Sequence, residues 1–220
     1  MSSKPEYIDY FNLAGELLGT DERKKVLKQQ ENQSRETGDT DIVVGSVMLL
    51  LFDTSGQVYI SQRSADKPEN PNLWDKSMGG HIVSGDSSDE TVKKELDEEL
   101  GIEASIVTDD MALSEEIKNP VTLTQRAIVK KVKEIKNYQS RRTTRDGDTW
   151  NKRMNVGLYI GIYNGEVKFK DGEVQNLRLT PITELEQEIR KNPDVFTDDI
   201  LKLIREHAVV DAIMGYAQKV

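Results

Sequence analysis

The distribution of hydrophobic and polar residues predicts a sheet near the start of the chain. The stretch Ile42–Phe52 is almost entirely apolar, which is typical of a central strand buried on both faces. A turn at Asp53–Gly56 connects it to a second strand at Gln57–Gln62. Upstream, apolar runs flank the polar segment Asn12–Gly15, so Tyr7–Thr20 is predicted to form a hairpin.

Further strands are predicted in the second half of the chain. Val156–Tyr163 is an apolar strand, and the dipeptide Asn164-Gly165 indicates a tight hairpin turn leading into Glu166–Lys170. Another strand is expected at Val174–Leu179. These strands belong to a sheet that begins with the N-terminal apolar stretches.

Three segments have the spacing and end signals of helices. In the first, Ser87 and Glu90 form a capping box, and an apolar stripe follows at Val92, Leu96 and Leu100. Thr180-Pro181 opens a second helix, with apolar positions Ile182, Leu185 and Ile189, and Asn192-Pro193 ends it. Thr197 is predicted to cap a last amphipathic helix with Ile200, Leu203 and Ile204 on its apolar face.

Two polar segments give weaker signals. Asp21–Thr40 is predicted to be a short helix followed by a linker. Lys118–Arg153 is predicted to be a solvated loop, although charged and aliphatic residues alternate within Lys130–Lys136. The functional alternative for this second segment is a mobile basic flap that meets substrate phosphates, because it contains Arg141, Arg142 and Arg145.

Composition limits the classes of function. A chain of 220 residues with 36% hydrophobic and 31% charged residues is typical of one soluble globular domain with extensions. It has no stretch resembling a membrane span and no signal-peptide pattern, so a cytoplasmic location is expected. The absence of Cys excludes disulfides and thiol catalysis, and the net charge of −9 argues against a broad nucleic-acid surface. A small phosphorylated substrate remains compatible with this charge.

The helix predicted after Ser87 carries the strongest candidate chemistry. Its residues Glu95, Glu98 and Glu99 are three and four positions apart, which places three carboxylates on one helical face. The three carboxylates repel one another, and a hard divalent cation such as Mg²⁺ or Mn²⁺ bound between them would turn this repulsion into attraction. A solvated helix face without a ligand is the alternative interpretation.

At these residues the chain resembles a known family. The segment reads Gly80-x5-Asp86-x7-Lys94-Glu95-Leu96-x-Glu98-Glu99-x-Gly101-Ile102 and is similar, at every spacing over 23 residues, to the Nudix box. That pattern has Glu where this chain has Asp86 and Arg where it has Lys94. Both replacements keep the charge, but Lys does not form the bidentate fork of Arg.

The resemblance implies a fold and a chemistry. It implies an α/β/α sandwich with a mixed β-sheet and metal-dependent cleavage of a diphosphate linked to another group. In the family, the glutamates matching Glu95, Glu98 and Glu99 hold Mg²⁺ or Mn²⁺, often with the backbone carbonyl at the position of Gly80. By the same resemblance, Glu95 and Glu98 are the candidate catalytic residues and Lys94 takes the place of the Arg that orients a catalytic glutamate.

The resemblance extends to one branch of the family. Tyr7–Thr20, Arg63 with Lys67, and Asn72–His81 resemble the isopentenyl diphosphate isomerases and their hydrolase relatives. The isomerases need a Cys directly before a Gly-His pair, where this chain has Gly79, and further histidines as metal ligands. The only histidines here are His81 and His207, so the hydrolase relatives are the better match.

Four residues near the box are candidates for substrate binding. Arg63 and Lys67 are placed to contact phosphates, Trp74 to stack, and His81 to assist a metal-bound water. Each has a structural alternative, as a strand-end charge, a packing residue or a hydrogen-bonded histidine. Glu173, in a turn, is a weaker candidate for a distant base.

Together these observations predict the organisation and activity of the chain. Residues 1–40 form an N-terminal hairpin and polar linker, and residues 41–220 form a Nudix domain with an insertion near 118–153. The predicted reaction is hydrolysis of a diphosphate linkage in a nucleoside diphosphate derivative or related small organic diphosphate. The alternatives are a non-catalytic ligand-binding domain and isomerase-like activity. With its apolar residues Tyr10, Phe11 and Leu17, the hairpin is expected either to extend its own sheet or to pair with another subunit in a homodimer.

Overall fold

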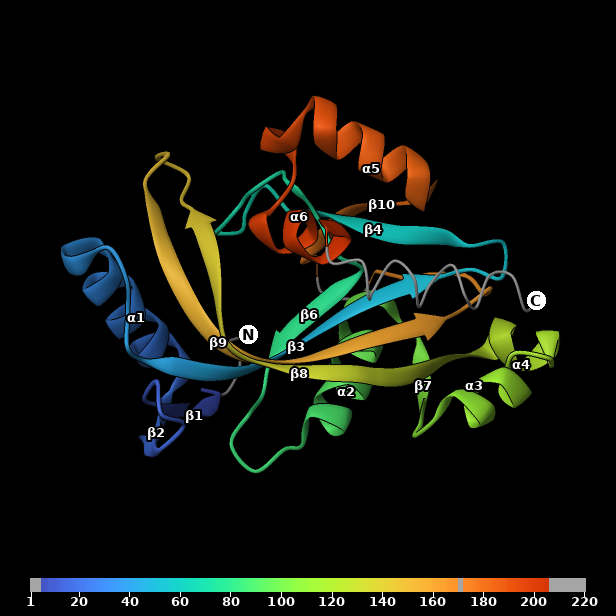
Figure 1. The fold of residues 1–220 in the computed structure, drawn as a ribbon, viewed down its shortest axis with the longest axis horizontal. Coiled ribbons are helices and arrows are strands. Elements are labelled where there is room, and N and C mark those ends of the chain that lie inside the picture. Colours follow the sequence, from blue (N-terminus) through green and yellow to red (C-terminus); the bar gives the residue numbers. More distant parts are fainter. Residues whose placement is uncertain (1–4, 170–171, 206–220) are drawn as a thin grey trace.

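A mixed β-sheet organises the molecule (Figure 1). In the computed structural model, which describes residues 5–169 and 172–205, ten strands form one sheet whose main path runs β10-β4-β3-β9-β8-β7. β3 is parallel to β9 and β7 is parallel to β8, whereas β8 and β9 are antiparallel. The strands are β1 (Tyr7–Phe11), β2 (Leu17–Glu22), β3 (Val43–Phe52), β4 (Gln57–Arg63), β5 (Trp74–Asp75), β6 (Met78–His81), β7 (Glu103–Val107), β8 (Arg126–Thr143), β9 (Thr149–Ile162) and β10 (Val174–Pro181).

Helices cover both faces of this sheet. They are α1 (Arg23–Thr37), α2 (Ser88–Leu100), α3 (Asp110–Glu116), α4 (Pro120–Gln125), α5 (Ile182–Lys191) and α6 (Asp198–Arg205), with a 3-10 turn at Pro193–Val195. The central strand β3 sends alternate side chains into two separate cores. Val47, Leu49 and Leu51 pack with the apolar stripe of α2, and Met48, Leu50 and Phe52 pack with α5 and α6. The predicted α/β/α sandwich is confirmed.

The strongly apolar or amphipathic elements agree with the sequence. The hairpin, the strands β3, β4 and β10, and the helices α2, α5 and α6 are all present. At the start of α6, the Thr197 hydroxyl accepts a hydrogen bond from the Ile200 amide, which confirms the predicted cap. The hairpin also joins the main sheet, because β1 pairs with β3 through Tyr10 and Val44.

The loop predicted for Lys118–Arg153 is wrong. Most of this segment forms β8 and the first part of β9, which pair across a tight turn around Gly147. The start of β9 therefore lies at Thr149 rather than at Val156. The sequence concealed this hairpin because charged side chains occupy its inward face: Arg142 and Lys152 are buried here. A buried cation breaks the apolar alternation that identifies a strand.

The hairpin turn predicted at Asn164-Gly165 is also wrong. Neither residue has the positive φ that the tightest hairpin turns require, and residues 166–169 form no strand. Lys170, the end of the predicted strand, lies outside the described residues. The Asn164 side chain instead exchanges hydrogen bonds with the backbone amide and hydroxyl of Thr54. A long-range contact has replaced the local turn.

The helix predicted within Asp21–Thr40 is longer than expected. α1 fills most of Asp21–Thr40 and leaves little linker. Its buried face carries Val26, Gln30 and Ser34, of which only the first is apolar. The Gln30 side chain donates to the backbone carbonyls of Ile42 and Arg153, at 2.7 and 2.9 Å. Hydrogen bonds therefore join α1 to β9 in addition to the packing of Val26 in the core. No helix in the described part of the chain is long and apolar enough to cross a membrane.

Candidate active site

The helix α2 has the caps and the buried apolar stripe that the sequence predicted. Ser87 and Glu90 form both hydrogen bonds of the capping box, and Gly101 ends the helix in the left-handed conformation. Val92, Leu96 and Leu100 are fully buried against the sheet. Burial of each contributes about 1.5–3 kcal/mol, which makes α2 a rigid support for its other side chains.

The glycine strand β6 lies directly against this helix. A Cβ on Gly80 would lie 2.1 Å from Oε1 of Glu95, so no side chain fits there while Glu95 keeps its position. The Gly80 carbonyl accepts a hydrogen bond of 2.8 Å from the Ser46 hydroxyl. The backbone of β6 and the carboxylate of Glu95 are thus brought together, as the resemblance to the Nudix box implied.

The electrostatics of Glu95 are unusual for a helix residue. Burial, followed by the nearby charges of Glu98 and Glu173, raises its pKa to about 7, while the charge of Lys94 opposes them. A carboxyl group with this pKa exchanges its proton near neutral pH. The arrangement also gives the acidic face the property expected of a cation site, because a bound cation would remove the repulsion.

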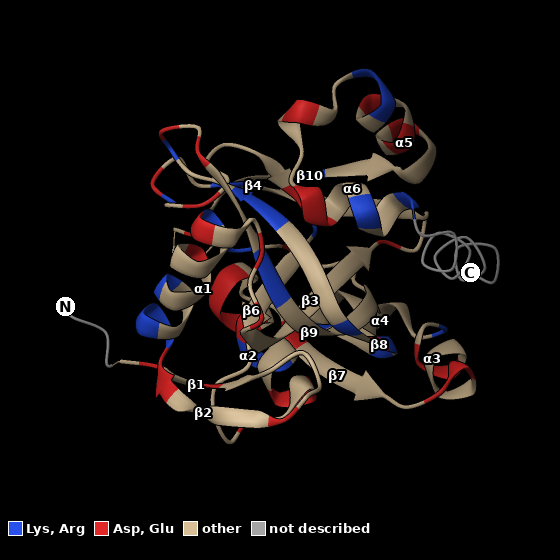
Figure 2. Cartoon of the chain, turned by 60° about the vertical axis from the view of Figure 1, so that its left-hand side comes forward, with Lys and Arg blue, Asp and Glu red and all other residues tan. Residues whose placement is uncertain are grey.

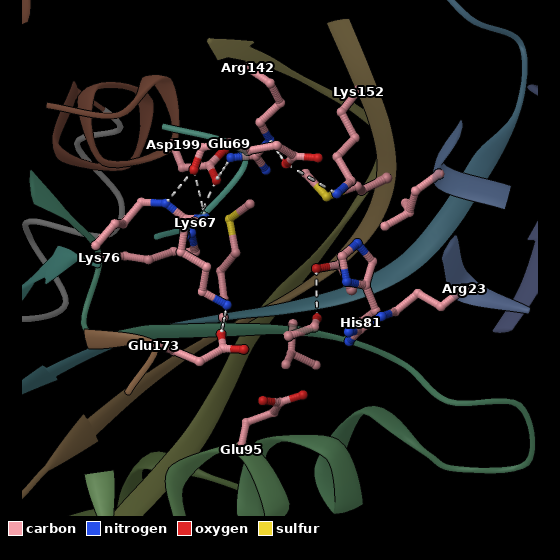
Figure 3. Close-up of a pocket in the computed structure, with 18 of the residues that line it drawn as sticks. Arg23, Lys67, Glu69, Lys76, His81, Glu95, Arg142, Lys152, Glu173 and Asp199 are labelled. Carbon is pink, nitrogen blue, oxygen red and sulfur yellow. Dashed lines mark hydrogen bonds and ion pairs between the residues drawn. The ribbon is translucent and has the colours of Figure 1, made fainter. Parts of the chain in front are cut away.

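Glu95 and Glu99 line a cavity of about 340 Å³ (Figure 3). Glu98 and Lys94 are exposed on the same helix and are not among its lining residues. Among the described residues, no three His, Asp or Glu side chains already converge as a metal site. The basic residues that line the cavity are Arg23, Lys24, Arg63, Lys67, Lys76, Arg142 and Lys152, and the acidic ones are Glu69, Glu95, Glu99, Glu173 and Asp199.

Two of the predicted phosphate-binding residues line this cavity. Arg63 donates two hydrogen bonds to the Glu69 carbonyl and lies 3.5 Å from the Asp75 carboxylate. Lys67 forms an ion pair with Glu173. In Figure 3 that pair lies between Glu95 and the cations at the far end of the cavity. The structure therefore places Glu173, a weak candidate from the sequence, inside the site.

The other two predicted substrate-binding residues differ in position. His81 lines the cavity, and its Nε2 atom is buried without a hydrogen-bond partner. Burial and then the charges of Lys152, Arg23, Arg142 and Lys76 hold its pKa well below the usual range, so the imidazole is neutral. Trp74 is not among the lining residues. The guanidinium carbon of Arg178 lies 4.6 Å from the centre of the Trp74 ring, and Trp74 packs against the core.

A buried ionic network closes the end of the cavity opposite α2. The Asp199 carboxylate accepts hydrogen bonds from Lys76 at 3.0 Å, Arg142 at 3.1 Å and Ser140 at 2.6 Å. Burial alone would raise the pKa of Asp199, but Arg142 and Lys76 outweigh it and hold this pKa far below its usual range. Next to the network, Lys152 lies 3.7 Å from Glu69.

Sequence reasoning missed this network. The sequence did contain a signal for the burial of Lys152. It lies two positions from Trp150 and Met154, and these residues share one buried face of β9 with Val156. Asp199 resembled an ordinary acid in the first turn of an amphipathic helix. Its partner Lys76 is 123 positions away in the chain, so no local pattern connects the two.

Comparison with known proteins decides the family. The model of the NUDIX domain matches residues 43–200. The chain belongs to the Nudix family. The matched region contains the glycine strand, α2 and the buried ionic network.

Among individual Nudix relatives, an uncharacterized Nudix hydrolase of Listeria monocytogenes is 37% identical over 81 residues, 32% of this chain and 48% of that protein. The chain thus spans about half the length of that relative. An isopentenyl-diphosphate Delta-isomerase of Serratia proteamaculans is 23% identical and aligns with 72% of this chain and 73% of its own length. The relatives therefore carry both hydrolase and isomerase names.

Solved structures show the same Nudix fold. The crystal structure of DR0079 from Deinococcus radiodurans covers 91% of this chain and 98% of its own, with a TM-score of 0.59 at 20% identity. The NUDIX domain of Shewanella oneidensis NrtR, solved with ADP ribose, covers 83% of this chain and 98% of its own, with a TM-score of 0.50 at 16% identity. These structures confirm the fold class.

Two departures from the Nudix box lie on the surface of the site. Asp86 is exposed in the loop before α2. Lys94 is exposed as well, and its influence is electrostatic, since its charge lowers the pKa of Glu95. An ammonium group on a flexible stem supplies this effect without the planar fork of Arg.

Proposed function

We propose that this protein hydrolyses a diphosphate linkage in a nucleoside diphosphate derivative or a related small organic diphosphate, with Mg²⁺ or Mn²⁺ as cofactor. The observation that carries the proposal is the division of one cavity into two parts. Carboxylates of α2 lie at one end, and Lys and Arg side chains gather at the other. A diphosphate that bridges the two ends meets a cation site and direct ion pairs at once.

The donor set fits a hard divalent ion. Glu95 and Glu99 line the cavity, and the Glu95 carboxylate occupies the space beside the Cα of Gly80. We assign Glu98, whose charge raises the pKa of Glu95, as the third carboxylate of the set. Mg²⁺ usually retains several waters and takes oxygens from substrate phosphates, so a few protein ligands suffice. When bound, the cation supplies charge neutralisation for the diphosphate and activation of water.

Side chains of the protein then carry out the proton transfer and hold the phosphates. Glu95 accepts the proton of the attacking water, and the charge of Lys94 lowers the pKa of this base. Lys67 and Arg63, both at the cavity, hold phosphate oxygens. The water oxygen forms a new bond to one phosphorus, the bond to the bridging oxygen breaks, and that oxygen leaves on the other phosphate.

Incubation with Mg²⁺ and a panel of nucleoside diphosphate derivatives and small organic diphosphates, followed by mass spectrometry, tests the proposal. We expect cleavage at the diphosphate, and a loss of about 100-fold or more in kcat for Glu95→Gln, as for removal of a general base. Asp97→Asn, an exposed acid of the same helix, is the matched control.

Each alternative has its own result in this experiment. Binding of panel members without any product would support a non-catalytic ligand-binding domain. A product of unchanged mass from isopentenyl diphosphate would support isomerase-like activity, for which Gly79 lacks the required thiol.

A further inference from the structure

The cavity holds more cationic side chains than a diphosphate at α2 requires. Three of its basic residues come from three separate elements: Arg23 from α1, Arg142 from β8 and Lys152 from β9. Figure 2 shows basic residues on the first turns of α1 and along β8, and acidic residues on α2. Of the described residues that line the cavity, none is Phe, Tyr or Trp. Charge rather than aromatic stacking is therefore the means of recognition at this end.

A buried nitrogen at the same end makes no hydrogen bond. It is Nε2 of His81, a residue that lines the cavity. Nε of Arg142 also lacks a hydrogen bond, but it faces the Glu69 carboxylate at 3.6 Å. An unpaired polar atom in a buried site costs free energy unless a ligand satisfies it. With a proton on Nε2, the imidazole is a hydrogen-bond donor, so the ligand that satisfies it is an acceptor.

The charges around His81 indicate that this acceptor is negatively charged. In Figure 3 the imidazole lies between Arg23 and Lys152. The Lys152 ammonium has Glu69 at 3.7 Å, and Arg23 forms a partly exposed ion pair of 2.7 Å with Glu6. Lys76 and Arg142 line the same cavity as these residues, so another cation is disfavoured beside Nε2 and an anion is favoured.

We propose that His81, Lys152 and Arg23 form a second anion-binding subsite, which takes a carboxylate or phosphate carried by the organic group of the substrate. The substrate is then a diphosphate with a separate anionic group at its other end. This assignment of the substrate rests on the proposed hydrolysis, but the subsite itself is testable without turnover.

Inorganic phosphate in metal-free protein is the first probe. The chain has two histidines, so His207→Gln leaves His81 as the only imidazole signal in a ¹⁵N NMR spectrum. We expect phosphate to shift this signal saturably. Arg23→Gln and Lys152→Gln should each raise the phosphate Kd about tenfold, the loss of one charge-assisted hydrogen bond. Lys28→Gln, on the exposed face of α1, should leave it unchanged.

A His81 signal that does not move, or that moves with the same Kd in all variants, would overturn the subsite. Arg23 is partly exposed, so Arg23→Gln keeps the test decisive even where Lys152→Gln fails to fold.

Turnover of a matched pair of substrates tests the assignment of the substrate. UDP-glucose and UDP-glucuronate differ by one carboxylate on the sugar. We expect a KM about tenfold lower for UDP-glucuronate, and loss of this preference in Arg23→Gln. Equal KM values in the wild-type protein would overturn the assignment. If phosphate binds at His81 but no diphosphate of the panel is cleaved, the proposed function fails while the subsite stands.

Discussion

The side chain of Lys76 occupies the space that any side chain on Gly79 would need. A Cβ on Gly79 would lie 2.5 Å from Cε of Lys76 and 3.3 Å from its Nζ. The same Nζ donates to Asp199 at 3.0 Å. By the resemblance to the isomerases, Gly79 takes the position of their Cys. A Cys side chain at this position would require the Lys76 side chain to move.

The first prediction is that Gly79→Ala destabilises the protein by about 1–3 kcal/mol, because the new methyl group displaces Lys76 within a packed interior. The free energy of unfolding in urea measures this cost. In a Lys76→Met background the same substitution should cost less, since both changes act through one contact. Additive costs in the double variant would show that Gly79 and Lys76 are independent.

Asp199 is predicted to be the most sensitive acid of α6. Asp199→Asn leaves Arg142 and Lys76 buried without their shared carboxylate, which costs about 3–5 kcal/mol. Asp198→Asn is the control. It breaks a partly exposed pair with Lys202 that contributes about 1 kcal/mol or less. Similar melting temperatures for the two variants would contradict the role given to the network.

The same residue predicts how stability depends on pH. The pKa of Asp199 is lowered in the folded state, so its contribution is complete above the unfolded value of about 3.9 and is lost as the pH falls below it. Unfolding in urea should therefore become steeply easier between about pH 4 and pH 2. This acid sensitivity should be weaker in Asp199→Asn, and an identical pH profile in the variant would refute the assignment.

The strong elements of the fold were predictable because their signals are local. A capping box and an apolar stripe fix α2, and an unbroken apolar run fixes β3. The Glu95 end of the site followed from these, since helical spacing alone directs its side chain. The other end did not. Lys76, Arg142 and Asp199 come from distant segments. Each is a charged residue in a buried position, where a sequence pattern leads one to expect an apolar residue. The full length of α1 was not predicted for a similar reason, since Gln30 and Ser34 are buried and hydrogen-bonded.

Mg²⁺ affinity is predicted to rise with pH. A cation and a proton compete for Glu95, whose pKa of about 7 means that protonation dominates at lower pH. Affinity should then fall by up to about tenfold per unit of pH below this pKa. Isothermal titration at pH 6, 7 and 8 measures the effect. Glu95→Gln should bind weakly and without this dependence, and a pH-independent affinity in the wild-type protein would contradict the assignment of Glu95.

Lys94 should set the position of that pH profile. Its charge lowers the pKa of Glu95, so Lys94→Gln is expected to raise this pKa and shift the Mg²⁺ binding curve to higher pH. Lys93→Gln changes the charge of the exposed neighbour and serves as the control. Lys94→Arg should retain the wild-type profile. A shift that is the same for Lys93→Gln would indicate a general charge effect.

The central claim is that the attacking oxygen comes from water and forms a bond to phosphorus. Turnover of an identified diphosphate substrate in ¹⁸O-labelled water, with Mg²⁺ present, tests it most directly by mass spectrometry of both products. The account predicts one labelled oxygen in one phosphate-containing product, because Glu95, which lines the cavity, is the proposed base for water and the chain has no Cys for a thiol intermediate. Product without label in any phosphate, or product of unchanged mass, would contradict hydrolysis at phosphorus.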